Sequence, residues 1–281
     1  MTYDVIVIGG GPAGLSGAVA LGRALRSVLV IDSGAPRNAP AEGIHNFLTR
    51  DGMSPAEFRA AGRAEAERYG GRIVDGEVVS ARRTAAGFAV TLADGSTHEA
   101  RRLLVTTGLV DELPDIPGLA ERWGTTLLHC PYCHGYEVRG KAIGVLAAAG
   151  SPMLAEKVRL WQQWSADVLP LAIDEIDRVV DGGVWRTDGT FVARDYLVAA
   201  PRFVARAGFL GDLGLSTVEH PMGVGAYVPA ADPTGRTDVP GVWVAGNVTD
   251  LMAQVITAAG AGLTAGAAIN LDLLPPAPGT R

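Results

Sequence analysis

The stretch YDVIVIGGGPAGLSGAVALGRALRSVLVID, residues 3–32, decides the fold. Its first six residues form a short apolar run that ends in glycines, which predicts a buried strand. Residues 12–26 are small and apolar along one side, as in a helix, and residues 27–32 form a second apolar run that ends in an acid. Strand, helix and strand in this order predict a βαβ unit and therefore an α/β fold with a parallel sheet.

Three glycines, Gly9, Gly11 and Gly14, follow the first predicted strand with the spacing G-x-G-x-x-G. In dinucleotide-binding proteins the first permits a tight turn, the second lets the backbone approach a pyrophosphate, and the third lets the helix pack on the strand. The helix N-terminus offers N–H groups to the phosphates, and Asp32 stands where an acid binds ribose hydroxyls. A glycine turn without a ligand is the alternative, but the order of strand, helix and acid favours dinucleotide binding.

The composition limits the other classes of function. A chain of 281 residues suggests one large domain or two modest ones. Its 24 Lys and Arg against 30 Asp and Glu give a net charge of −6, which argues against a broad nucleic-acid surface. Apolar residues make up 48% and charged residues 19%, enough for a core and too little charge for disorder. The N-terminal sequence has no basic region and no cleavage site of a signal peptide.

Residues 251–269 contain no charge and approach the length of a membrane-spanning helix. About half of them are Ala or Gly, however, and Gln254, Thr257 and Thr264 are interspersed. The segment is therefore only weakly hydrophobic for a helix surrounded by lipid. We therefore expect a buried core helix with close backbone contacts, and no membrane span.

The remaining predicted elements suggest two units. The first group is an amphipathic helix over 54–69, capped by Ser54 with Glu57 three residues on, a small antiparallel sheet over 72–81 and 87–93, and a strand over 101–107. After a Pro-rich joint at 111–118 come a strand near 142–147, a helix near 153–164, a strand near 168–172 and short strands across 184–200. A joint around 219–233 leads to a strand and turn over 239–250, before the Ala/Gly helix from about Asp250. We expect a discontinuous dinucleotide-binding domain, 1–115 and 230–275, an insert, 116–229, and a tail, 276–281.

The only two cysteines, Cys130 and Cys133, lie in the string HCPYCH, residues 129–134. A secreted disulfide scaffold would need more of them. C-x-x-C-H is also the string of c-type haem attachment, which requires export, and zinc commonly takes two separated ligand pairs. C-P-Y-C occurs in glutaredoxins, whose layout differs, and an inert buried pair is a further alternative. We favour a redox dithiol at a helix start, where the dipole and neighbouring groups stabilise a thiolate.

Four strings together carry a family resemblance: CPYCHGYE at 130–137, DSGAPRN at 32–38, IHNF at 44–47 and AGNVTD…QVITAAGAG at 245–262. They resemble the FAD-dependent, thioredoxin-reductase-like disulfide oxidoreductases, and most closely the dithiol oxidases that close disulfides in holomycin- and gliotoxin-type natural products. The resemblance covers almost the whole chain except part of the insert. It implies a three-layer (ββα) Rossmann-like FAD domain interrupted by a smaller, truncated nicotinamide-domain-like α/β insert that carries the C-x-x-C. It also implies a homodimer and a cytoplasmic location.

The resemblance implies roles for single residues. Cys133 would contact the flavin and Cys130 would exchange with the substrate. His134 stands where thioredoxin reductases commonly carry an Asp acid/base; an imidazole titrates near neutral pH and can shuttle a thiol proton, although a plain surface histidine is the alternative. Asn247 stands where the family usually has Asp. We expect no metal ligand. The residues expected to bind the cofactor are Gly9, Gly11, Pro12, Ala13, Gly14, Asp32, Ser33, Arg37, Asn38, His45, Val78, Thr107, Gly108, Gly246, Asn247, Gln254, Val255 and Ile256.

The insert departs from a thioredoxin reductase in its nicotinamide half. A second G-x-G-x-x-G/A is expected after its first strand, but Ala147, Ala149 and Pro152 stand at the aligned positions. A Cβ at the second position blocks the close approach of a pyrophosphate. Residues 173–177 (IDEID) then carry acids where bases would hold a 2′-phosphate. The stretch has room for one βαβ unit and a meander, so we expect no efficient use of NADPH.

These observations predict an FAD-dependent dithiol/disulfide oxidoreductase. We expect it to oxidise a small-molecule or protein dithiol to a disulfide through Cys130 and Cys133, with oxygen as the electron acceptor. A disulfide reductase driven by ferredoxin, another donor or NADPH is one alternative. A flavoprotein redox sensor without turnover is another.

Overall fold

The computed structural model describes residues 2–275, so the predicted tail lies outside the described residues. The chain forms two compact units. The first comprises Met1–Ala39, Ala56–Val110 and Phe203–Arg281, and the second comprises Pro40–Pro55 and Asp111–Arg202. The predicted interruption of one domain by an insert therefore has a counterpart in the structure, with different bounds.

A seven-stranded sheet forms the centre of the first unit, in the order β3-β2-β1-β6-β5-β4, with β18 also paired to β6. Its strands are β1 (Thr2–Ile8), β2 (Val28–Asp32), β3 (Arg72–Asp75), β4 (Val78–Thr84), β5 (Gly87–Leu92), β6 (Thr97–Val105) and β18 (Val242–Val244). Strands β3, β2, β1, β6 and β18 are parallel, whereas β5 and β4 continue the sheet antiparallel. The runs at 72–81 and 87–93 thus extend the main sheet and do not form a separate one, because β6 begins at Thr97 and pairs with β1 on one side and β5 on the other.

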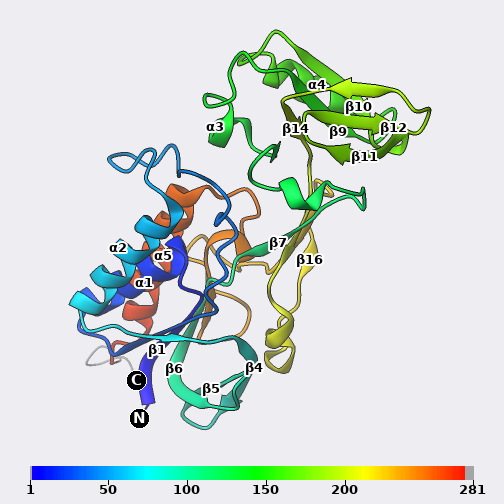
Figure 1. Ribbon diagram of the computed structural model, residues 1–281. Coiled ribbons are helices and arrows are strands. Elements are labelled where there is room, and N and C mark those ends of the chain that lie inside the picture. Colours follow the sequence, from blue (N-terminus) through cyan, green and yellow to red (C-terminus); the bar gives the residue numbers. More distant parts are fainter. Residues whose placement is uncertain (1, 276–281) are drawn as a thin grey trace. The chain divides into compact units, whose positions relative to one another are not determined.

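Three helices cover one face of this sheet: α1 (Pro12–Arg23), α2 (Pro55–Arg68) and α5 (Val255–Asp272), which lie close together in Figure 1. Alternate residues of a strand point to opposite faces. Val5 and Val7 accordingly belong to the core beneath the helices. Ile6 and Ile8 belong to the core on the other face, with residues of β4 and β5.

Helix α5 begins at Val255, five residues later than predicted. By length and apolar composition it could cross a membrane. In the structure it packs along α1, where a Cβ on Gly262 would overlap the carbonyl oxygen of Ala13 and a Cβ on Gly17 would lie 3.1 Å from the carbonyl oxygen of Gly262. The Ala- and Gly-rich sequence therefore allows the close helix contact that we expected of a core helix.

Residues 203–229 belong to the first unit and not to the insert. They contain most of β15 (Arg202–Ala205), the 3-10 helix η3 (Gly208–Leu213), β16 (Val218–Glu219) and β17 (Gly225–Tyr227), in a sheet of order β16-β17-β15-β7 with β7 (Leu109–Glu112). The physical reason is burial: Ala205, Leu210 and Val228 lie in the same core as Ile6. The boundaries therefore fall at 110/111 and 202/203 instead of 115/116 and 229/230.

The second unit holds a four-stranded parallel sheet, β10-β9-β14-β8. Its elements are β8 (Leu127–Leu128), α3 (Pro131–His134), β9 (Ile143–Ala147), α4 (Pro152–Trp161), β10 (Val168–Ala172) and β14 (Tyr196–Val198), with an antiparallel sheet of β11 (Ile176–Val180), β12 (Gly183–Arg186) and β13 (Phe191–Ala193), and short 3-10 helices η1 (Ala120–Arg122) and η2 (Ile173–Glu175). Figure 1 shows α4 beside β9 and β10. The unit thus contains one βαβ unit, β9–α4–β10, followed by a meander, as the sequence predicts.

Candidate cofactor and dithiol sites

The predicted cofactor residues of the first unit collect at one edge of its sheet. Strands β2, β1, β6 and β18 are parallel neighbours, so their carboxyl ends meet there. Gly9 follows β1, Thr107 and Gly108 follow β6, and Gly246 follows β18. Ligands of α/β sheets bind outside the carboxyl ends of the strands. Segments far apart in the sequence therefore form one candidate cofactor site.

The three fingerprint glycines have the backbone geometry that their spacing predicts. Gly9 has φ +109°, a conformation that favours glycine. A Cβ on Gly14 would overlap the carbonyl oxygen of Gly9, so only glycine lets α1 lie so close to the turn. A Cβ on Gly11, in contrast, would meet nothing within 4 Å. This open space beside Gly11 is the approach that a pyrophosphate needs.

Helix α1 begins at this turn. Gly11 is its N-cap residue and has no side chain that could cap the helix. Pro12 is the first helical residue, and Ala13 and Gly14 are buried. The first N–H groups of a helix have no partner inside the helix and carry a partial positive charge. The start of α1 is thus free to donate hydrogen bonds to a phosphate.

Asp32 ends β2 and is buried, with 7% of its surface exposed. Its Oδ1 accepts a hydrogen bond from the Gly34 N–H at 3.3 Å. Arg59 and Arg63 of α2 approach Oδ2 at 3.5 and 3.3 Å. Two guanidinium groups thus hold the carboxylate that we expect to bind a ribose. Neither arginine was among the predicted site residues, although their spacing of four residues places them on one side of the predicted helix.

Asp32 also lies against Gly10, where a Cβ would come 2.6 Å from the carboxyl carbon. Gly10, which the spacing rule leaves unassigned, is thus required by the packing of Asp32.

Buried Thr106 was not among the predicted site residues either. Its hydroxyl donates to the carbonyls of Ile8 at 3.0 Å and Gly9 at 2.8 Å, which ties the end of β6 to the glycine turn. The neighbouring Thr107 donates to the Arg206 carbonyl at 2.6 Å.

Asn247 has a structural role in the turn before α5. Its Nδ2 donates to the carbonyl oxygens of Asp250 at 3.0 Å and Ala253 at 2.9 Å. The amide nitrogen therefore fixes the turn before α5. An Asp, the usual residue of the family here, has no hydrogen to donate to these carbonyls when ionised. The substitution thus suits the local structure of this chain.

The other predicted cofactor residues lie in several segments of the first unit, except His45. Arg37 lies over the Phe203 ring, with its guanidinium carbon 5.1 Å from the ring centre, and Gly108 has φ +69°. Ser33 and Asn38 are in the segment after β2, Val78 begins β4, Gln254 is the N-cap residue of α5, and Val255 and Ile256 are its first helical residues. His45 belongs to the second unit.

The C-x-x-C lies at the carboxyl end of β8 in the second unit. Cys130 precedes the single-turn helix α3, and the Cys133 N–H donates to the Cys130 carbonyl at 3.1 Å. Both cysteines are partly exposed. His129 Nδ1 lies 3.0 Å from the carbonyl of Ala199, beyond the end of β14. The predicted helix start is correct, although the four residues of α3 make only a small dipole.

His134 ends α3, and both of its ring nitrogens are buried without a well-aligned hydrogen bond to the described residues. Burial is the main cause that lowers the pKa of His134. Glu137 raises this pKa, His45 lowers it and the Cys130 backbone raises it. His134 is therefore a neutral imidazole close to neutral pH, which can accept a proton. It is not the plain surface histidine of the alternative interpretation.

Residues 40–55 contact the redox motif from a distant part of the sequence. Asn46 Nδ2 donates to the carbonyl of Tyr132, between the two cysteines, at 2.7 Å. His45 Nε2 lies 3.6 Å from Glu137 Oε1, and its Nδ1 lies 3.5 Å from Asp51 Oδ2. Within the second unit, His45 is thus a neighbour of the redox motif. We had expected it only at the flavin.

The carboxyl ends of β9 and β10 are where a nicotinamide nucleotide would bind in such a unit. Ala147 there is buried, whereas Ala149 is exposed and carries a Cβ at the position of the second glycine. After β10, Asp174 and Glu175 are exposed in η2. The structure thus places small side chains and acids at this edge, as the sequence indicates.

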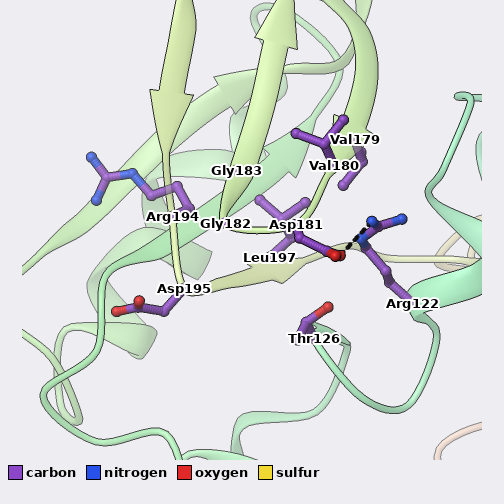
Figure 2. Close-up of a pocket in the computed structure, with 10 residues that line it drawn as sticks. All are labelled: Arg122, Thr126, Val179, Val180, Asp181, Gly182, Gly183, Arg194, Asp195 and Leu197. Carbon is purple, nitrogen blue, oxygen red and sulfur yellow. Dashed lines mark hydrogen bonds and ion pairs between the residues drawn. The ribbon is translucent and has the colours of Figure 1, made fainter.

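A separate pocket of about 180 Å³ lies at the opposite end of this sheet, and Figure 2 shows the residues around it. Thr126 and Asp195, which precede β8 and β14, line it. Its charged groups pair within the protein: Arg122 with Asp181 at 2.7 Å, and Asp195 with the Ala142 N–H at 2.9 Å. This pocket therefore has no chemistry in common with the dithiol. Among residues 2–275, no group of three or more His, Cys, Asp and Glu could hold a metal ion.

Known proteins of similar sequence and fold bear on these sites. Residues 3–146 match the family described as pyridine nucleotide-disulphide oxidoreductase. The chain is similar to thioredoxin reductase tcpT of Claviceps purpurea, with 34% identity over 96% of this chain and 94% of that protein. It is also similar to the crystal structure of HlmI, with 41% identity, a TM-score of 0.86 and coverage of 97% and 92%. An oxidoreductase from Agrobacterium tumefaciens has 35% identity, a TM-score of 0.90 and coverage of 98% and 100%.

Proposed function

Because the chain belongs to the pyridine nucleotide-disulphide oxidoreductase family, and within it is thioredoxin-reductase-like and FAD-binding, we propose that it is a dithiol oxidase. In this proposal a substrate dithiol reduces the Cys130–Cys133 pair, and oxygen is the final electron acceptor. The protein does not rely on NADPH.

One observation carries this choice of direction. The second unit has a single βαβ unit, and the carboxyl ends of β9 and β10 present Ala149, Asp174 and Glu175. A nicotinamide site needs glycine at the position of Ala149 for close backbone approach, and bases to hold a 2′-phosphate. Without an efficient supply of hydride from NADPH, the substrate dithiol is the electron source in this proposal.

Two thiol–disulfide exchange steps would transfer the electrons from the substrate to the cysteine pair. A substrate thiolate attacks Sγ of Cys130 in the Cys130–Cys133 disulfide, and Cys133 leaves as a thiolate. The second substrate thiolate attacks the mixed disulfide, which releases the substrate disulfide and leaves Cys130 reduced. Bound FAD would supply the oxidant for the reduced pair, and the two electrons and two protons would pass to oxygen, which becomes hydrogen peroxide. The residues of the glycine turn and Asp32 would hold the pyrophosphate and ribose of FAD.

His134 would take the proton of an attacking thiol in this scheme. A general base must be neutral to accept a proton, and burial lowers the pKa of His134. Its buried ring nitrogens make no well-aligned hydrogen bond with the described residues, and only the Cys130 backbone interacts with the ring in this way. The position directly after Cys133 supports this role.

An anaerobic titration of the purified holoprotein tests the direction. NADPH is added to one sample and dithiothreitol to another, while the visible absorbance of oxidised flavin is followed. We expect only the dithiol to bleach the flavin, and air to restore the colour. Stoichiometric bleaching by NADPH would contradict the proposal. Failure of the dithiol to bleach it would do so as well.

A disulfide reductase is the second candidate, and the relative named thioredoxin reductase tcpT favours it. In that case NADPH, or reduced ferredoxin added to the same anaerobic sample, would bleach the flavin, and a protein disulfide would restore it. Binding of FAD with no response to either donor or to dithiols would favour a redox sensor.

We also propose that the chain is a cytoplasmic homodimer. Helix α5 exposes apolar side chains, with Leu263 54% and Leu271 70% exposed, although its other face packs on α1. A second copy that covers this face would remove the apolar surface from water. Light scattering after gel filtration measures the mass directly. A monomer at micromolar concentration would contradict the proposal.

A further inference from the structure

A short loop of the second unit, residues 44–53, is built to hold its position beside the redox motif. We call it the arm. It closes on itself, because the Ile44 N–H donates to the Met53 carbonyl at 2.8 Å and the Gly52 N–H donates to the Ile44 carbonyl at 2.7 Å. Ile44 anchors it, with only 3% of its surface exposed. The arm therefore has a defined shape despite having no helix or strand.

Two side chains of the arm reach the redox motif at different points. Asn46 donates to the Tyr132 carbonyl at 2.7 Å, and His45 Nε2 approaches Glu137 at 3.6 Å. Asp51 supports both residues from within the arm: its Oδ1 accepts from the Asn46 N–H at 2.8 Å, and its Oδ2 lies 3.5 Å from His45 Nδ1. One carboxylate thus orients the two residues that contact the motif.

The backbone of Asn46 is unusual. It has φ +62°, in the left-handed region that residues other than glycine seldom adopt. Asn tolerates this conformation better than most residues, but it still carries strain that the surrounding contacts must maintain. Here the Asp51 and Tyr132 hydrogen bonds do so, and the strained turn directs the Asn46 side chain to the motif.

We propose that the arm positions the acid–base group of the dithiol: Asn46 fixes the Tyr132 peptide between the two cysteines, and His45 fixes the Glu137 carboxylate three residues after His134. His45 and Glu137 are positioning residues in this proposal, because they act through His134. The proposal deepens the function proposed above and rests on the role of His134 there.

Glu137 and His45 have opposite effects on the pKa of His134. The Glu137 carboxylate raises the pKa of His134 and His45 lowers it, against a background in which burial lowers it most. Cys130 also approaches the ring through its backbone, and Asp51 lies behind His45. Removal of Glu137 and removal of His45 should therefore shift the titration of His134 in opposite directions. A role in packing alone predicts no such opposition.

The titration of His134 is measurable by NMR of its ring in the oxidised holoprotein, with His134→Gln to assign the signal. We expect Glu137→Gln to lower the apparent pKa by a few tenths of a pH unit, about the size of a screened charge interaction, and His45→Gln to raise it by a similar amount. His98→Gln, in β6 of the first unit, is the matched control and should leave it unchanged. Shifts in the same direction, or no shift in either variant, would overturn this part of the proposal.

Asn46→Asp tests the other contact. It keeps the tolerance for the left-handed conformation but replaces the donor with a carboxylate that faces the Tyr132 carbonyl. We expect faster amide hydrogen exchange over residues 130–137, with unchanged exchange in β1 and β2. Unchanged exchange over 130–137 would overturn the role of Asn46. Neither experiment uses NADPH, a dithiol or oxygen, so its outcome is independent of the direction of the reaction.

Discussion

Gly262 of α5 lies so close to Ala13 of α1 that a Cβ on Gly262 would overlap the Ala13 carbonyl oxygen. Ala13 belongs to the first turn of α1, directly behind the glycine turn that we expect to hold the pyrophosphate. The last helix of the chain thus supports the first from behind, and the candidate cofactor site depends on residues about 250 positions apart.

This contact predicts that Gly262→Ala lowers the free energy of unfolding by about 1–3 kcal/mol, the usual cost of overpacking. Gly260→Ala is a matched control on the same helix, because its Cβ would meet nothing within 4 Å. There we expect no loss, or a gain of up to about 1 kcal/mol from helix propensity. Urea unfolding of both variants measures the difference. Equal stabilities would contradict the close contact.

Gly11→Ala tests whether Gly11 is needed for FAD binding without being needed for folding. The new Cβ occupies open space in the protein alone but blocks the approach of a pyrophosphate. We expect the stability of the apoprotein to change by less than about 1 kcal/mol, while the dissociation constant of FAD, measured by flavin fluorescence, rises at least about tenfold. Gly208→Ala, also in open space within the first unit, should bind FAD normally. Normal FAD binding by Gly11→Ala would place the pyrophosphate elsewhere.

Asn247→Asp restores the residue that the family usually has, yet we expect it to destabilise this chain by about 1–3 kcal/mol. The ionised carboxylate cannot donate to the Asp250 and Ala253 carbonyls, which lose their partner. Those carbonyls favour the protonated form, so the folded state binds the proton more tightly and the loss of stability is smaller at pH 4 than at pH 7.

Asn270→Asp is the control for this substitution. Asn270 Oδ1 accepts a hydrogen bond from Arg26 Nε at 2.7 Å, and a carboxylate accepts it equally well. Thermal unfolding at both pH values compares the two variants. A stable Asn247→Asp protein at pH 7 would show that the amide donors contribute little.

The pH dependence of stability reports on His134. Its pKa in the folded protein is lowered by burial, so the unfolded chain binds the proton more readily. Stability is therefore expected to fall as the pH decreases from the ordinary histidine value, about 6.5, through the lower pKa of the folded state. His134→Gln should remove this part of the slope, which is at most about 1.4 kcal/mol per pH unit. Melting curves of the holoprotein between pH 5 and 8 test it, and an unchanged slope would mean that His134 is solvated.

Local rules predict the parts of this protein whose determinants are close in sequence. The β1–α1–β2 unit, its three glycines and Asp32 follow from residues 3–32, and β9–α4–β10 followed by a meander also agrees with the structure. In these segments the apolar period and the glycine spacing act within a single supersecondary unit. Short-range patterns are sufficient there.

Long-range contacts account for what the sequence did not reveal. The short strands of residues 203–229 belong to the first unit because buried side chains such as Leu210 join its core. Likewise, His45 is assigned a partner only when residues 44–53 fold against Glu137, 92 positions along the chain. The role of Asn247 depends on the three-dimensional path of residues 250–253, which sets where their carbonyls point.

The pairing of β18 with β6 and of α5 with α1 has a consequence for synthesis on the ribosome. All residues of the second unit, up to Arg202, have been made before β18 and α5 exist. The N-terminal βαβ unit, although translated first, waits for residues 242–272 to complete its sheet and cover its helix. The inserted unit can therefore fold before the first unit is complete, and we expect the chain to capture FAD only after residues 242–272 have been made.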